Sequence, residues 1–191
     1  GEDLNRIFPG DAAGSISHRL AAAVWERTAS ADALVDLHCC GQHGLPYILA
    51  LHGESPAARE LARRIPLPRC VQSYGSAGQL FVESARRRGQ ASCIIELPSG
   101  AGEGAVNLET AQMCFHALLD LLRSYGMLAG EVSGASPAFF GPLLDADCER
   151  AGFWRPRVRR GEAIAKGQLI GTLDGAPVAA PEAGAAMSVR P

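Results

Sequence analysis

Three ionisable side chains at the ends of apolar runs are the strongest candidates for chemistry. In the segment Asp36-Leu37-His38, Asp36 and His38 lie two residues apart, so in a strand they would share one face while Leu37 packs on the other. Glu96 directly follows the apolar run of residues 93–95. Burial there would raise the proton affinity of its carboxyl group towards the range that suits a general base. The alternatives are a hydrogen-bonded histidine at a strand end and a solvated glutamate.

Other polar clusters give weaker signals. Asn5 and Arg6 in the segment Asp3-Leu4-Asn5-Arg6 combine an amide with a guanidinium, a pair that suits a carboxylate ligand, although a polar loop is the simpler interpretation. The pair Cys39-Cys40 beside His38 could contact a metal, but packing is the more common role of such thiols. The basic run at residues 86–88 is typical of a solvated helix end.

Strands and helices alternate in the pattern between residues 15 and 126, which predicts an α/β fold with a mixed sheet flanked by helices. A small all-β module follows, with glycines set around short apolar runs. We therefore predict an N-terminally incomplete α/β domain over 1–133 and a C-terminally incomplete lipoyl-like or barrel-sandwich module over 138–191. The expected helices span about 18–27, 55–64, 77–88 and 107–126; the expected strands span 33–38, 47–51, 70–74 and 91–97.

Composition excludes several classes of function. The net charge is −2, so no basic excess favours a nucleic-acid partner. No apolar stretch approaches the ~20 residues of a membrane helix. Six cysteines without a CxxC pair argue against a zinc ribbon and favour a reduced, cytoplasmic location.

Together these segments resemble the succinylglutamate desuccinylase/aspartoacylase family, a branch of the zinc carboxypeptidase-like superfamily. The resemblance rests on residues 3–10, 36–38 and 94–97, which occur in the family's order. Residues 161–171 resemble the family's C-terminal β motif. The resemblance implies the mixed α/β fold predicted above and a hydrolase acting on an amide bond that is not a peptide bond.

The same resemblance assigns roles to the candidate residues. His38 would be the third protein ligand of one Zn²⁺ ion, and Glu96 would be the general base and acid. Asn5 and Arg6 would hold the substrate carboxylate. Arg86 would lie near the scissile amide, although its two neighbouring arginines compete for that role. Asp3 and Asp36 would be carboxylates that orient the metal-binding groups.

The sequence departs from the family in one respect. The family supplies its first two zinc ligands from a His-x-x-Glu motif upstream of the Asn-Arg segment, and no histidine here has a glutamate three residues later. We therefore expect an N-terminally incomplete sequence that binds zinc weakly and has little or no activity by itself.

The leading hypothesis is a zinc-dependent deacylase that releases an acyl group from an N-acyl amino acid or a related small carboxylate. Within the family, the pattern is more similar to bacterial deacylases, including deacetylases of N-acetyl-diaminobutyrate, than to animal aspartoacylases. The alternatives are a zinc carboxypeptidase acting on peptides and a metal-free binding protein of the same fold. The expected partner is the small substrate, with no nucleic acid or membrane, and homo-oligomerisation is left open.

Overall fold

Local sequence signals start most of the helices of the chain. The computed structural model describes residues 2–100, 105–145 and 150–189. Ser15, Ser55 and Asn107 each accept a backbone N–H at the start of a helix, as capping residues do. The resulting elements before the sheet's last strand are η1 (Leu4–Arg6), α1 (Ile16–Arg27), β1 (Ala33–Cys39), β2 (Tyr47–Ala50), α2 (Pro56–Arg63), β3 (Arg69–Gln72), α3 (Leu80–Arg88), β4 (Ala91–Leu97) and α4 (Leu108–Ser124).

Five strands form one mixed sheet in the order β1-β4-β2-β3-β5, where β5 is Ala138–Phe140. β1 and β4 are parallel, whereas β2 runs antiparallel to β4 and parallel to β3. The mixed α/β fold is thus confirmed. The sheet extends past residue 133, because residues 138–140 pair with β3; the division of the chain into domains stays a prediction.

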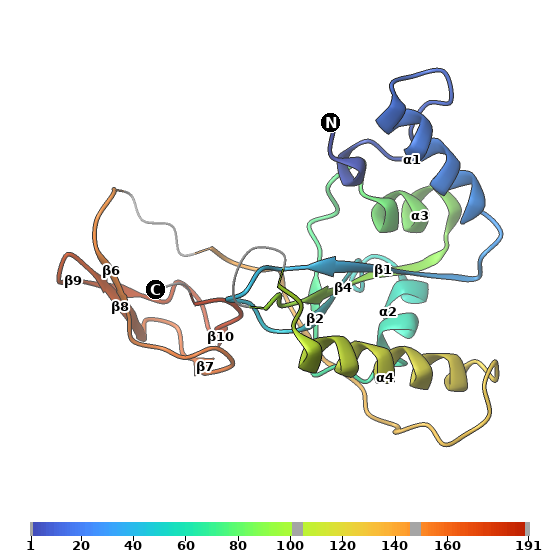
Figure 1. Ribbon diagram of the computed structural model, residues 1–191. Helices are drawn as coiled ribbons and strands as arrows, with labels where there is room; N and C mark the ends of the chain where they lie inside the picture. Colours follow the sequence, from blue (N-terminus) through green and yellow to red (C-terminus); the bar gives the residue numbers. More distant parts are fainter. Residues whose placement is uncertain (1, 101–104, 146–149, 190–191) are drawn as a thin grey trace.

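Helices cover both faces of the sheet (Figure 1). On one face, α2 and α4 pack over the largest core cluster, which includes Ile48, Cys93 and Ile95. On the other face, α3 packs on Ile94, and α1 packs against η1 and the start of α3. Since β1 lies at one edge of the sheet, Leu37 is 53% exposed where the apolar pattern predicted packing.

A small antiparallel β module follows, as predicted. β6 (Trp154–Pro156), β8 (Leu169–Leu173) and β9 (Ala176–Ala179) form one sheet, while β7 (Ala163–Ile164) pairs with β10 (Gly184–Ala185). The hairpin between β8 and β9 turns at Asp174-Gly175, both with positive φ, as expected for a tight primed turn.

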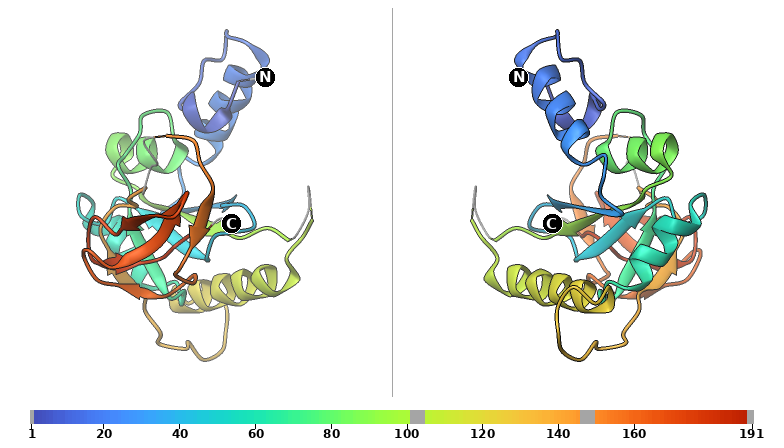
Figure 2. Two further views of the ribbon diagram at one scale, coloured as in Figure 1. Left: turned by 90° about the vertical axis from the view of Figure 1, so that its left-hand side faces the viewer. Right: turned by 90° about the vertical axis from the view of Figure 1, so that its right-hand side faces the viewer.

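The β module contacts the loop between β1 and β2. Leu45 donates its N–H to the carbonyl of Met187 at 3.1 Å, and Arg160 donates to the carbonyl of Gly44 at 3.1 Å. The module therefore lies at the end of the sheet where β1 and β4 finish (Figure 2). Within the described ranges, no helix combines the length and the apolar character needed to cross a bilayer.

Candidate functional site

His38 and Glu96 face each other across two neighbouring strands. They are register partners in the parallel pair β1–β4, so their side chains leave the same face of the sheet at its carboxyl end. That end is the usual location of sites in α/β folds. The prediction that Asp36 and His38 share a face is confirmed, because the Asp36 Oδ2 to His38 Nε2 distance is 3.1 Å. A carboxylate at this distance fixes the orientation of the imidazole ring.

Glu96 lies in an environment that does not satisfy its carboxyl group. Its Oε2 atom is buried and has no hydrogen-bond partner among the described residues. Burial raises the pKa of Glu96 above its ordinary value; the nearby His38 lowers it and Asp36 raises it further. A buried acceptor without a partner is uncommon in folded proteins, and it is expected where a ligand or a water molecule binds.

Two further side chains are neighbours of this pair: Cys40, which the sequence offered as a possible metal contact, and Tyr47, which it did not single out. Tyr47 starts β2 and is the antiparallel register partner of Glu96. Burial, with the charge of Glu96 adding to it, raises the pKa of Tyr47, and the same causes raise the pKa of Cys40 to about 11. Both groups therefore keep their protons at neutral pH. No sequence signal marked Tyr47, because its position depends on the direction of β2.

Asn5 and Arg6 lie beside the start of α3, and no recorded hydrogen bond or ion pair among the described residues joins either of them to His38 or Glu96. The carbonyl of Phe81, the second residue of α3, accepts the Ser92 hydroxyl at 2.7 Å, so the helix begins over the first half of β4 and not over its carboxyl end. Asn5 Oδ1 accepts the N–H of Leu80 at 3.0 Å and so caps this helix. The Arg6 side chain is 57% exposed and its guanidinium lies 3.9 Å from Asp3. An exposed guanidinium at this position is accessible to a ligand.

Asp3 is engaged locally and not with the histidine. Its carboxylate accepts the N–H of Asn5 at 2.9 Å and so caps η1. Among the described residues it makes no recorded contact with His38. Its proposed role towards a metal-bound histidine stays a prediction.

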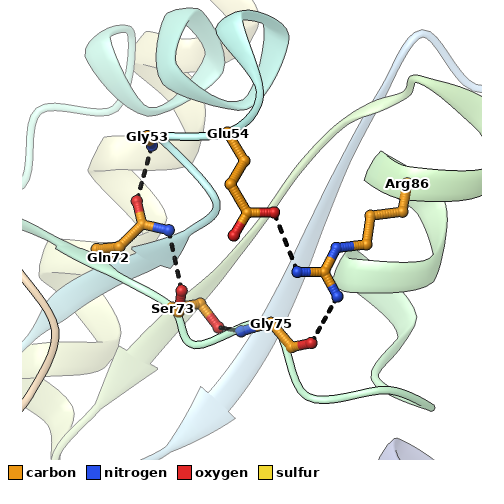
Figure 3. Close-up of polar contacts among 6 residues, drawn as sticks. All are labelled: Gly53, Glu54, Gln72, Ser73, Gly75 and Arg86. Carbon is orange, nitrogen blue, oxygen red and sulfur yellow. Dashed lines mark hydrogen bonds and ion pairs between the residues drawn. The ribbon is translucent and has the colours of Figure 1, made fainter.

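Arg86 lies in the last turn of α3. Its guanidinium donates to Glu54 Oε2 at 3.0 Å and to the carbonyl of Gly75 at 2.7 Å (Figure 3). Glu54 follows β2 at the end opposite to the one that pairs with Glu96. No recorded hydrogen bond or ion pair among the described residues brings Arg86 to the His38–Glu96 pair, so its role near the substrate stays a prediction.

The loops that hold Arg86 are themselves joined by hydrogen bonds. Gln72 Oε1 accepts the N–H of Gly53 at 2.7 Å, and Gln72 Nε2 donates to the carbonyl of Ser73 at 2.9 Å. Ser73 Oγ accepts the N–H of Gly75 at 3.0 Å, so the network reaches both partners of Arg86 (Figure 3).

The residues present fit only part of a zinc site. A catalytic zinc ion has three protein ligands and one open position. Within the described parts of the chain, no group of three or more His, Cys, Asp or Glu residues is placed to hold a metal ion. His38 and the Glu96 oxygen, which has no hydrogen-bond partner among the described residues, are insufficient by themselves to hold the ion.

Comparison with known proteins gives consistent results. Residues 1–124 match the succinylglutamate desuccinylase/aspartoacylase catalytic domain. The chain is 26% identical over 183 residues to N-alpha-acetyl-L-2,4-diaminobutyric acid deacetylase of Halomonas elongata, covering 89% of this chain and 53% of that protein.

Solved structures share the fold. A succinylglutamate desuccinylase/aspartoacylase from Rhodobacter sphaeroides matches with 25% identity and a TM-score of 0.72, covering 97% of this chain and 61% of that one. The product-bound ectoine utilization protein EutE (DoeB) from Ruegeria pomeroyi matches with 20% identity and a TM-score of 0.73, covering 96% of this chain and 61% of that one. The chain thus spans about half to three fifths of the length of these proteins. With two thirds of its residues inside the matched catalytic domain, the chain belongs to the succinylglutamate desuccinylase/aspartoacylase family.

Proposed function

We propose that the chain is the larger part of a zinc-dependent deacylase that hydrolyses the amide bond of an N-acyl amino acid or a related small carboxylate. The observation that carries the proposal is the pairing of His38 with Glu96 on adjacent strands, where one carboxylate oxygen is buried with no hydrogen-bond partner in the described part of the chain. The match to the family's catalytic domain and the likeness to a deacetylase support the reaction class.

The zinc ion would be held by His38 and by two ligands from outside the described residues, and it would supply the Lewis acidity that polarises the amide carbonyl. Asp36 would hold the His38 ring in one orientation. We assign the remaining chemistry to the chain's own side chains.

Glu96 would act as general base and then as general acid. It takes a proton from the attacking water, whose oxygen bonds to the carbonyl carbon, and returns that proton to the nitrogen as the C–N bond breaks. The products are a carboxylate and a free amine. The raised pKa of Glu96 favours this role, because a carboxylate with a higher proton affinity is a stronger base towards the attacking water.

Arg6 and Asn5 would bind the substrate's carboxylate at the start of α3. The exposed Arg6 guanidinium can make a two-point contact with a carboxylate, and the Asn5 amide nitrogen remains a donor while its oxygen caps the helix.

A cytoplasmic location is consistent with the five described cysteines, which are all free.

The test is the release of amine by the longer protein that carries this chain. We expect zinc in the purified protein, hydrolysis of N-acetyl amino acids, loss of activity with a chelator and recovery with Zn²⁺. Faster cleavage of short peptides than of N-acetyl amino acids would favour a carboxypeptidase. Absence of zinc and of turnover in the longer protein would favour a metal-free binding protein. By itself, the chain described here should show little or no turnover.

A further inference from the structure

A cavity of about 750 Å³ lies between the sheet and the β module. Its floor includes Tyr47, Val71 and Phe140, and its walls include Trp154 and Met187 from the module. The three floor residues leave one face of the sheet: Val71 is the parallel register partner of Leu49, two residues after Tyr47, and also of Phe140. This volume is within the range of small-molecule sites.

The cavity adjoins the candidate site. Tyr47, on its floor, is the register partner of Glu96, and Cys40, on its wall, comes two residues after His38. The floor of the cavity and the His38–Glu96 pair therefore lie on the same face of the sheet. A substrate bound at Glu96 would have this cavity on the β2 side of the strand.

The charges of the lining are of one sign. Among the described lining residues, only Asp145 and Glu182 are charged, and Glu182 pairs with Lys166 at 2.8 Å. No arginine, lysine or histidine of the described ranges lines the cavity. An anionic group placed here would lose hydration and meet no opposite charge, whereas an uncharged apolar group would lose little.

From its lining, its volume and its position, we infer that this cavity binds the acyl chain of the substrate, and that this chain is apolar, uncharged and longer than acetyl. The inference rests on the proposed function, since it assigns the acyl half of the same substrate. Each buried methylene should tighten binding about fourfold, because its transfer from water contributes about 0.8 kcal/mol. A chain ending in a carboxylate, such as succinyl, should be excluded.

Binding can be measured without turnover through Trp154. The sequence has two tryptophans. Trp25, on α1, packs under the guanidinium of Arg88 and does not line the cavity. In a Trp25→Phe background, Trp154 is therefore the only indole of this sequence. Titration with N-octanoylglycine should give a saturable change in Trp154 fluorescence. The dissociation constant read from it should be at least tenfold lower than that of N-butyrylglycine. N-succinylglycine, matched to butyryl in carbon number, should give no such change in fluorescence. Succinyl binding as tight as butyryl, or no dependence on chain length, would overturn the inference.

Two glycines in the lining can be replaced by larger residues that would fill the cavity and block binding of the acyl chain. Gly184 lines the cavity, has no left-handed φ, and a Cβ built there meets no atom within 4 Å. Gly184→Leu should weaken octanoyl binding at least tenfold. The matched control is Ala163→Leu, on the exposed part of the paired strand β7 and outside the lining. Unchanged octanoyl binding in the Gly184 variant would contradict the assignment.

Gly141 offers a second block if the Gly184 variant does not fold, as judged by circular dichroism. It also lines the cavity with free space at its Cβ, and Gly141→Leu should have the same effect. The proposed function and the acyl-chain inference can be contradicted by different results. Octanoyl binding without amide hydrolysis in the longer protein would contradict the proposed function, whereas hydrolysis restricted to acetyl or succinyl substrates would contradict this inference alone.

Discussion

Asn5 has a structural task besides the one proposed for it at the substrate. Its Oδ1 accepts the N–H of Leu80, the first residue of α3, for which the preceding Gln79 supplies no side-chain cap. Asn5→Ala should therefore lower the free energy of unfolding by about 1 kcal/mol in urea denaturation. Asn5→Asp keeps an acceptor and should stay close to the parent protein. Equal losses in both variants would show that the cap contributes nothing.

Asp174 makes the stability of the folded protein depend on pH, and the direction of its pKa shift fixes the sign of that dependence. Its carboxylate accepts the N–H of Phe153 at 2.7 Å and a bond from Arg150 at 2.6 Å, which together hold the pKa of Asp174 below its ordinary value. Because the folded pKa is lower than the unfolded one, its stabilisation is present above the unfolded pKa and is lost as the pH falls through the folded pKa.

The measurement is the thermal midpoint of Asp174→Asn and of the parent between pH 2 and 7. The deficit of the variant should be largest near neutral pH and should shrink in acid. Asp32→Asn, at an exposed aspartate with no recorded side-chain hydrogen bond in the described ranges, is the control and should show no such trend. A deficit that grows on acidification would contradict the assignment.

The parts of the candidate site that depend on the geometry of a single strand were predictable from the sequence. Alternation along β1 placed Asp36 and His38 together, and the polar end of an apolar run marked Glu96. Tyr47 could not be foreseen, because it meets Glu96 only when β2 runs antiparallel to β4. Arg86 shows the converse, since its partners Glu54 and Gly75 come from two loops that the sequence does not bring together.

At the scale of elements, α4 shows how an apolar stripe can mislead. Leu108, Ala111 and Phe115 repeat at helical spacing, yet all three are exposed. The face that packs on the sheet contains Cys114, Ala117 and Leu121. The helix is apolar on more than one side, so periodicity alone does not fix its rotation.

A pair of truncations tests that rotation. Leu121→Ala should lower the free energy of unfolding by about 2–5 kcal/mol, because Leu121 is buried in the main core. Phe115→Ala removes a larger side chain that is 60% exposed, and it should cost no more than about 0.5 kcal/mol. Both values come from chemical denaturation. A greater loss for Phe115 than for Leu121 would reverse the assigned faces.

Helix starts were less predictable than helix existence. The pattern placed the start of the third helix at about residue 77, whereas α3 starts at Leu80. Gly78 has φ +80°, and a Cβ there would clash with the carbonyl oxygen of Arg6. The contact between this loop and η1, more than 70 residues apart in the sequence, sets the start of the helix.

At the scale of the whole molecule, the carboxyl ends of β1 and β4 bring together two of the candidate groups and place them beside the β module. β1 and β4 bring His38 beside Glu96 and the β module closes the adjoining cavity, whereas Asn5 and Arg6 lie at the start of α3. The alternation of strands and helices predicted the layers. It did not predict this convergence, because contacts such as Leu45 with Met187 join segments more than 140 residues apart.

The most direct test of the proposed chemistry is the rate of amine release from an N-acyl amino acid by the longer protein and its Glu96→Gln variant. Glu109→Gln, on the exposed first turn of α4, is the matched control. Loss of the general base should lower kcat about 10²- to 10⁴-fold with an unchanged melting temperature, while the control stays within about twofold. A Glu96→Gln variant that turns over substrate at the parent rate would contradict the account.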